Sequence, residues 1–223
     1  MFLEFNKFLA SGSGNDVLFV SSRGSCSHNF VLSHMLGNAL KKQQTVHLIC
    51  CGESSQFFSL VCQRAGLPFR QSLEKGDLKI TCQVTSWRAQ AARGEALTVP
   101  DVEIDSDRNL VIFDDLLPLL DISSCNEVLR RVFEIKAKVK SMLVIGLKAD
   151  DPESERLSKF LKSMSTMWVD VFPLSTGYSK EVHGVIELSN INPINDSSKQ
   201  KMHFKVTERG AKLLVIGSHI PIT

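Results

Sequence analysis

Residues 16–42, DVLFVSSRGSCSHNFVLSHMLGNALKK, decide how the rest of the chain is interpreted. Val17–Val20 is a short apolar run with the length of a buried strand. Small residues follow over Ser21–Ser27, and from Asn29 onward apolar residues recur at helical spacing. The stretch therefore predicts a strand, a loop of small residues and a helix, at the start of an alternating α/β pattern.

This order of elements is that of a phosphate-binding P-loop, whose sequence G-x-x-x-x-G-K-[ST] would fall on residues 22–29. Serine replaces both glycines, histidine replaces the lysine and asparagine replaces the Ser/Thr, at Ser22, Ser27, His28 and Asn29. The lysine would bring a fixed charge to phosphate and the hydroxyl would hold Mg²⁺, whereas histidine is mostly neutral at pH 7. We interpret the loop as a degenerate, inactive P-loop. The alternative is an ordinary strand–helix turn that never bound a nucleotide.

Two aspartates, Asp114 and Asp115, follow the apolar strand predicted at Leu110–Phe113. In a P-loop protein a carboxylate at this place, the Walker B position, holds Mg²⁺. Aspartates after strands also cap turns, so Asp114 is either a relic of a Walker B residue or a plain turn residue. One carboxylate without the lysine and the hydroxyl cannot assemble a hydrolytic site, so we expect no catalytic residue, no metal site and no cofactor.

The remaining sequence first alternates between strands and helices and then changes pattern. Strands are predicted at Thr45–Cys51, Leu78–Val84, Leu110–Phe113 and Met142–Leu147. Helices between them have N-cap signals at Ser54 or Ser55, Ser124 and Asp151. Short strands separated by turns follow at Met167–Phe172, Glu181–Leu188, Met202–Val206 and Lys212–Ile216. This is the order of a RecA-like domain, with three layers, a central mostly parallel sheet and C-terminal antiparallel hairpins, and we assign residues 1–223 to one such domain.

Two segments do not fit the alternation. Residues 1–12 have no long apolar core and do not form a signal peptide. Their apolar side chains are spaced to form one face of a short docking helix: Phe2, Phe5 and Leu9. Thr85–Arg108 is interpreted as a helical fragment followed by an exposed linker, with Trp87 anchoring it to the core.

Bulk composition is that of an ordinary globular protein. The chain has 223 residues, 43 % of them hydrophobic and 22 % charged, with a net charge of +2 that does not by itself demand nucleic acid. Six cysteines form no C-x-x-C pair, which favours reduced thiols in the cytoplasm or nucleus. No run is long enough to span a membrane. The histidines are scattered, and none is paired with a nucleophile.

Three stretches in order resemble the sixth subunit of the Elongator complex. They are LFVSSRGSCSHNFVLSHML after the first strand, NLVIFDDLLPLL in the Walker B place and PLSTGYSKEVHGVIEL in the hairpin region. The most specific piece is L-x-T-G-x-x-x-x-V-H-G at Leu174–Gly184. The resemblance covers nearly the whole chain.

The resemblance implies a RecA-like fold without Walker residues, in a hetero-hexameric ring with Elongator subunits four and five. It further implies that the ring binds tRNA, that the complex modifies the wobble uridine, and that the catalytic chemistry belongs to another subunit. In such a ring a degenerate P-loop survives as an interface, for which we single out Arg23 and Gly24.

Two other functions stay open from the sequence. One is an active or weakly active P-loop ATPase of the recombinase-paralogue kind that acts on DNA; His28 in place of lysine argues against it. Arg23 beside Gly24, near a helix N-terminus, leaves weak nucleotide binding open. The other is a stand-alone interaction module.

Overall fold

The structure is a computed structural model that describes residues 3–10, 16–97, 108–177, 179–191, 198–208 and 210–215. Its strands are β1 (Val17–Ser22), β2 (Val46–Cys50), β3 (Leu78–Cys82), β4 (Leu110–Phe113), β5 (Met142–Lys148), β6 (Met167–Phe172), β7 (Gly184–Asn190), β8 (Ser198–Thr207) and β9 (Gly210–Val215). Its helices are α1 (Leu3–Ala10), α2 (Asn29–Lys41), α3 (Ser55–Arg64), α4 (Phe69–Lys75), α5 (Gln83–Ala92), α6 (Leu117–Leu120), α7 (Cys125–Lys138) and α8 (Pro152–Met164).

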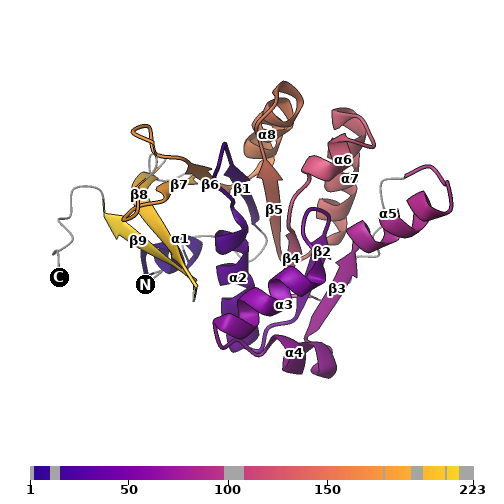
Figure 1. Ribbon diagram of the computed structural model, residues 1–223, viewed down its shortest axis with the longest axis horizontal. Coiled ribbons are helices and arrows are strands. Elements are labelled where there is room, and N and C mark those ends of the chain that lie inside the picture. The colour runs from indigo at the N-terminus through magenta and orange to yellow at the C-terminus, as the bar shows by residue number, and fades with distance from the viewer. Residues whose placement is uncertain are drawn as a thin grey trace.

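The described strands form a single sheet in the order β3-β2-β4-β5-β1-β6-β7-β8-β9. The six strands from β3 to β6 in this order pair in parallel, and β7, β8 and β9 continue the sheet as antiparallel partners. Figure 1 shows the antiparallel strands beside α1, at the opposite end of the molecule from β3 and α5. The predicted mostly parallel sheet with C-terminal antiparallel hairpins is confirmed.

Helices cover both faces of the sheet, which gives the predicted three layers (Figure 1). Successive side chains of a strand point to opposite faces, and β1 follows this rule. Leu18 and Val20 pack in the core shared with α1 to α4, whereas Val17 and Phe19 pack in the core shared with α6, α7 and α8. The strong apolar stripe of α8 is explained by this second core, in which Leu157 and Leu161 are fully buried.

Chain direction brings the loops that follow β1 and β4 to the same edge of the sheet. Both strands are parallel to β5, which lies between them, so all three end at their carboxyl edge. In open α/β sheets ligand sites lie outside this edge. The loop after β1 and the aspartates after β4, predicted from the sequence as parts of one site, are therefore brought together.

Several predicted boundaries are corrected by the structure. The loop begins at Arg23 and not at Ser21, because Ser21 and Ser22 are buried and pair with β5. The strand predicted at Glu181–Leu188 runs from Gly184 to Asn190, in register with β6. The short helices α4 and α6 were not predicted, since neither has enough residues for a periodic apolar stripe.

The two atypical segments are partly described. Helix α1 packs on its own domain, with the ring of Phe5 fully buried and 5.7 Å from that of His34 on α2; Phe2 lies outside the described residues. Helix α5 accounts for the expected helical fragment, and Trp87 packs against the core of α6 to α8. Residues 98–107 of the predicted linker are also outside the description. No helix in the described part of the chain has the length and apolar character needed to cross a membrane.

Candidate functional site

The residue at the P-loop lysine position, His28, is a buried bridge between two strands. Its side chain is 2 % exposed. Nδ1 lies 2.8 Å from the hydroxyl of Ser22, at the end of β1, and Nε2 lies 2.7 Å from the backbone oxygen of Asp114, after β4. A carbonyl oxygen only accepts, so Nε2 carries the proton and Nδ1 accepts from the Ser22 hydroxyl. Both ring nitrogens are thus used inside the chain.

Burial keeps the His28 ring neutral. It lowers the pKa of His28 below the usual value, and the nearby carboxylates of Asp115 and Glu53 only partly oppose this effect. A P-loop lysine brings a permanent positive charge to phosphate. A neutral imidazole with both nitrogens engaged offers no such charge.

The His28 side chain crosses β5 at Gly146, and a side chain at residue 146 would block this crossing. Strand β5 lies between β1 and β4, and Gly146 pairs with Val20. A Cβ atom at residue 146 would stand 2.0 Å from the backbone oxygen of Asp114 and 2.6 Å from Nε2 of His28. Gly146 therefore allows His28 to reach from the loop to the end of β4.

Asp114 at the Walker B position is held by backbone amides. Its carboxylate accepts hydrogen bonds from the N–H groups of Cys51 (2.6 Å), Gly52 (3.1 Å), Glu53 (2.7 Å) and Asp115 (2.7 Å). The side chain is fully buried, which raises its pKa to about 6 although the four amides favour the charged form. Its oxygens point into the β2–α3 loop, so Asp114 ties this loop to β4.

The neighbouring Asp115 also acts as a local cap. Its Oδ1 accepts from the backbone N–H groups of Leu117 (2.9 Å) and Lys148 (3.1 Å). In this geometry both aspartates accept hydrogen bonds from the backbone of neighbouring loops. Among the residues that the structure describes, no three His, Cys, Asp or Glu side chains are placed to hold a metal ion.

The other two P-loop positions are also engaged locally. The hydroxyl of Ser27 accepts from the backbone N–H of Asn29 at 3.1 Å. The side-chain amide of Asn29 donates to Glu53 at 2.8 Å. Ser22, Ser27, His28, Asn29 and Asp114 therefore lie around one corner of the sheet, and their polar atoms bond to one another or to nearby loops.

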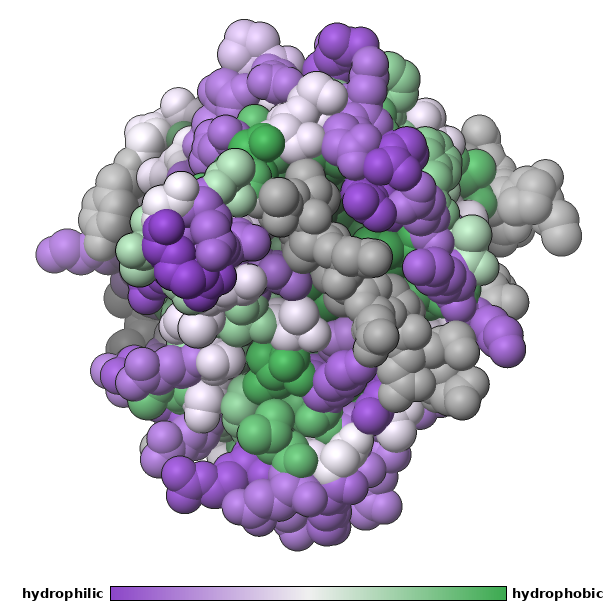
Figure 2. Space-filling model, turned by 90° about the vertical axis from the view of Figure 1, so that its right-hand side faces the viewer, coloured by the Kyte–Doolittle hydropathy of each residue, from purple (hydrophilic) through white to green (hydrophobic). Residues whose placement is uncertain are grey.

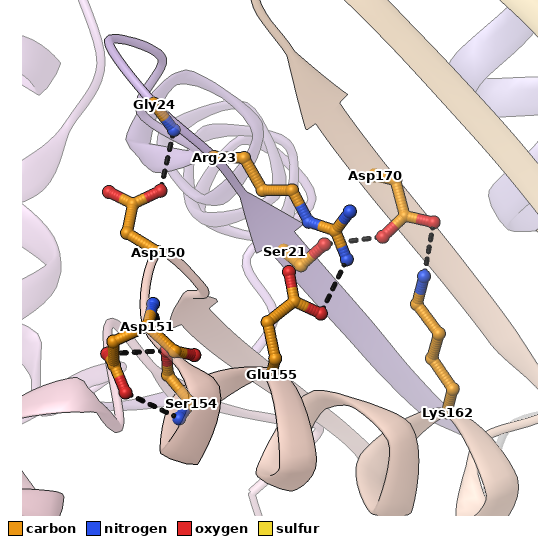
Figure 3. A network of polar contacts seen from close by, with 9 residues as sticks. All are labelled: Ser21, Arg23, Gly24, Asp150, Asp151, Ser154, Glu155, Lys162 and Asp170. Carbon is orange, nitrogen blue, oxygen red and sulfur yellow. Dashed lines mark hydrogen bonds and ion pairs between the residues drawn. The ribbon is translucent and has the colours of Figure 1, made fainter.

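Arg23 and Gly24 contact α8 and the loop before it (Figure 3). The guanidinium of Arg23 forms an ion pair with Glu155 at 2.9 Å and lies 5.5 Å from the ring centre of Phe172. The backbone N–H of Gly24 donates to Asp150 at 2.6 Å, and its φ of +58° is a left-handed value that favours glycine. The charge of Arg23 is thus partly neutralised within the chain, and the side chain remains 36 % exposed.

A second polar group lies next to Arg23, between β1, β6 and α8 (Figure 3). The hydroxyl of Ser21 donates to Asp170, whose other oxygen pairs with Lys162 at 2.6 Å. The side chain of Asp170 is only 5 % exposed, so this pair is nearly buried. Neither this pair nor the role of Gly146 was predicted from the sequence. An aspartate inside the apolar strand MWVDVF and a glycine inside MLVIGLK were the available signals.

The geometry is that of a RecA-like domain in which the polar side chains at the P-loop position bond to one another and to nearby loops. No family model matches the sequence, and no curated protein matches it. Similar solved structures include the flagellar accessory protein FlaH of Methanocaldococcus jannaschii, with a TM-score of 0.70, 12 % identity and 95 % of each chain covered. They also include a KaiC-like protein of Pyrococcus horikoshii, with a TM-score of 0.64, 9 % identity, and 90 % of this chain and 89 % of that chain covered. At these identities the likeness concerns the fold alone, and the predicted RecA-like fold is confirmed.

Proposed function

We propose that this chain is a non-catalytic subunit of the Elongator complex, in a hetero-hexameric RecA-like ring with subunits four and five. The ring would bind tRNA and support modification of the wobble uridine. The observation that carries the non-catalytic part is the buried, neutral bridge of His28 from Ser22 to Asp114. His28 occupies the position from which a P-loop lysine would bind phosphate.

The assignment to Elongator is based on sequence resemblance. It depends on the ordered stretches around the degenerate P-loop, around Asp114 and over Leu174–Gly184. The RecA-like fold is compatible with this assignment but is shared by many other proteins.

Exposed apolar surface supports a role in an assembly. Figure 2 shows the end of the molecule that carries β3 and α5, where apolar residues gather in the lower half of the face among hydrophilic ones. On α3 and α4, Leu60 is 48 % exposed and Leu73 is 45 % exposed. Apolar side chains gathered on one face of a molecule are typical of protein interfaces.

Co-expression with Elongator subunits four and five, followed by mass measurement, tests the ring. We expect a stable hetero-hexamer and a chain that behaves poorly alone. A monodisperse monomer that forms no complex with either partner would refute the assignment.

tRNA binding is the second test. One chain with a net charge of +2 gathers few phosphate contacts, whereas a ring combines contacts from several subunits. At near-physiological salt the ring should therefore bind tRNA more tightly than the lone chain. Equal affinity would contradict this part of the proposal.

The interface role of Arg23 needs a matched control, because Arg23 already pairs with Glu155. Arg23→Glu reverses the charge of the loop, whereas Glu155→Gln breaks the same internal pair without reversing it. Weaker assembly in Arg23→Glu alone would support a contact with a neighbouring subunit. Equal loss in both variants would assign the effect to the internal pair.

The P-loop ATPase alternative is tested by turnover. We expect no ATP hydrolysis above background from the purified chain. A rate that exceeds background and drops in Asn29→Ala, with folding checked by circular dichroism, would favour the ATPase instead. Asn29 suits this test because its side chain is only partly buried and bonds to a loop residue, Glu53.

A further inference from the structure

A groove of about 850 Å³ lies along α2, on the face of the sheet that carries α1 to α4. One side of α2 forms its floor, with Ser33, Gly37 and Lys41 at four-residue intervals. Helix α3 borders the groove on one side, and the β8–β9 hairpin and α1 border it on the other. Apolar side chains of these walls include Phe57, Val61, Leu67, Phe204 and Val206. The groove meets the degenerate P-loop at one end only and continues along the helix.

Apolar side chains of the walls and two small residues of α2, Ser33 and Gly37, line the middle of the groove. A Cβ atom on Gly37 would stand 2.5 Å from Leu67, so glycine lets the wall close onto α2. The hydroxyl of Ser33 is buried and has no hydrogen-bond partner among the described residues. Val206 leaves 38 % of its surface exposed at the rim. The floor of the groove thus holds a hydroxyl group without a hydrogen-bond partner among the described residues, and its rim holds exposed apolar surface.

Opposite charges stand at the two ends of the groove. Glu53 precedes α3, and Glu208 lies in the β8–β9 turn, both at the end near the P-loop. Lys41 and Arg64 are the last residues of α2 and α3, at the other end. None of these four side chains forms an ion pair within the described ranges of the chain.

The dimensions fit one face of an α-helix. Helix α2 has 13 residues and is therefore about 20 Å long. A volume of about 850 Å³ spread over that length gives a cross-section of about 40 Å², roughly half that of a helix 10 Å in diameter. An amphipathic helix would bury its apolar face in a groove of this length and cross-section and leave its polar face in water.

An extended peptide fits this site less well. Helices form the floor and one wall, and their backbone groups are used in their own hydrogen bonds. Along α2 and α3 the backbone of an extended occupant would find few partners, whereas a helix satisfies its own backbone.

We propose that this groove binds one amphipathic α-helix of a second protein chain, oriented parallel to α2. The occupant carries apolar residues at i, i+3, i+4 and i+7 against the middle of the groove. Its first turn, with the positive end of the helix dipole and basic side chains, faces Glu53 and Glu208. Acidic side chains in its last turn face Lys41 and Arg64. This binding does not depend on ring assembly.

The test uses two pools of labelled synthetic peptides about 14 residues long, which matches the length of α2. The first pool has Lys-Lys near the start, Glu-Glu near the end, and anchors varied among Leu, Ile, Met and Phe. The second pool differs only in that the charged ends are exchanged. We expect members of the first pool to bind the full chain about tenfold more tightly than members of the second pool in fluorescence polarisation. The reason is that the charges at both ends of the peptide are reversed between the two pools.

Variants at the far end of the groove make the test specific. Lys41→Glu with Arg64→Glu should shift the preference toward the second pool. The matched control, Lys138→Glu with Lys159→Glu, changes two exposed lysines on the opposite face and should leave the preference intact.

Three results would overturn the proposal. The first is no binding from either pool, and the second is equal binding of both pools. The third is a gain in peptide affinity when the chain is shortened to end at Val215, which would assign the groove to residues 216–223 of the same chain. A ring that assembles while the peptides fail would overturn this inference alone and leave the proposed function standing.

Discussion

Replacing Gly146 by alanine should destabilise the domain strongly, because the new methyl group collides with the His28 bridge. The added Cβ would stand 2.0 Å from the Asp114 carbonyl oxygen and 2.6 Å from Nε2 of His28. The first of these atoms belongs to the backbone of the sheet edge and cannot rotate away. The second belongs to a ring held at both nitrogens.

The expected cost combines two effects. Overpacking of a close-packed interior costs about 1–3 kcal/mol. Pushing His28 out of place leaves a buried polar group unsatisfied, which costs about another 1–3 kcal/mol. A total of about 4 kcal/mol is a large part of the stability of a typical domain. It corresponds to a fall in melting temperature of roughly 8–16 °C for a chain of this size.

Urea unfolding and thermal melts of Gly146→Ala and Gly66→Ala measure this cost. Gly66 has a φ of +67° and no atom within 4 Å of a built Cβ, so its variant carries only backbone strain of about 1–2 kcal/mol. In a His28→Ala background the added cost of Gly146→Ala should shrink, because one of the two collisions is gone. The reasoning is wrong if Gly146→Ala loses no more stability than Gly66→Ala.

Three further changes test other parts of the site. Asp114→Asn should lower the free energy of unfolding by about 2–4 kcal/mol in urea titration, because the NH2 group that replaces one carboxylate oxygen cannot accept from the backbone amides around it. Lys162→Met should cost about 3 kcal/mol by leaving Asp170 buried without its cation, and Lys162→Met with Asp170→Leu should recover most of it. Burial lowers the pKa of His34 to about 4, so the unfolded chain binds this proton more readily. The difference in stability between the native chain and His34→Asn should therefore fall by up to about 3 kcal/mol as the pH drops from about 6.5 to about 4, and taking this difference cancels the opposite contribution of Asp114, whose pKa is raised to about 6.

The sequence predicted the fold class better than the state of the site. Apolar runs and cap residues depend on local chemistry, so β4 and the start of α8 at Pro152 were placed to the residue. Short helices and the start of β7 depend on pairing and packing across the chain, which a single sequence does not display. The P-loop alignment identified which residues meet at one corner, but not that His28 would reach across β5 to the carbonyl oxygen of Asp114.

That reach explains how several substitutions in one loop fit together. A lysine at residue 28 would bring a charged ammonium group into a buried corner, and burying a charge is costly even where the Ser22 hydroxyl and the Asp114 carbonyl oxygen can accept from it. A neutral histidine forms a hydrogen bond with both groups: its Nε2–H donates to the carbonyl oxygen, and its Nδ1 accepts from the hydroxyl that serine at residue 22 supplies. Burial leaves the ring without a positive charge for phosphate, and its two hydrogen bonds stabilise the junction of β1, β5 and β4. Restoring only His28→Lys should therefore destabilise the chain without restoring a nucleotide site, because Ser22, Gly146 and Asp114 are arranged for the imidazole.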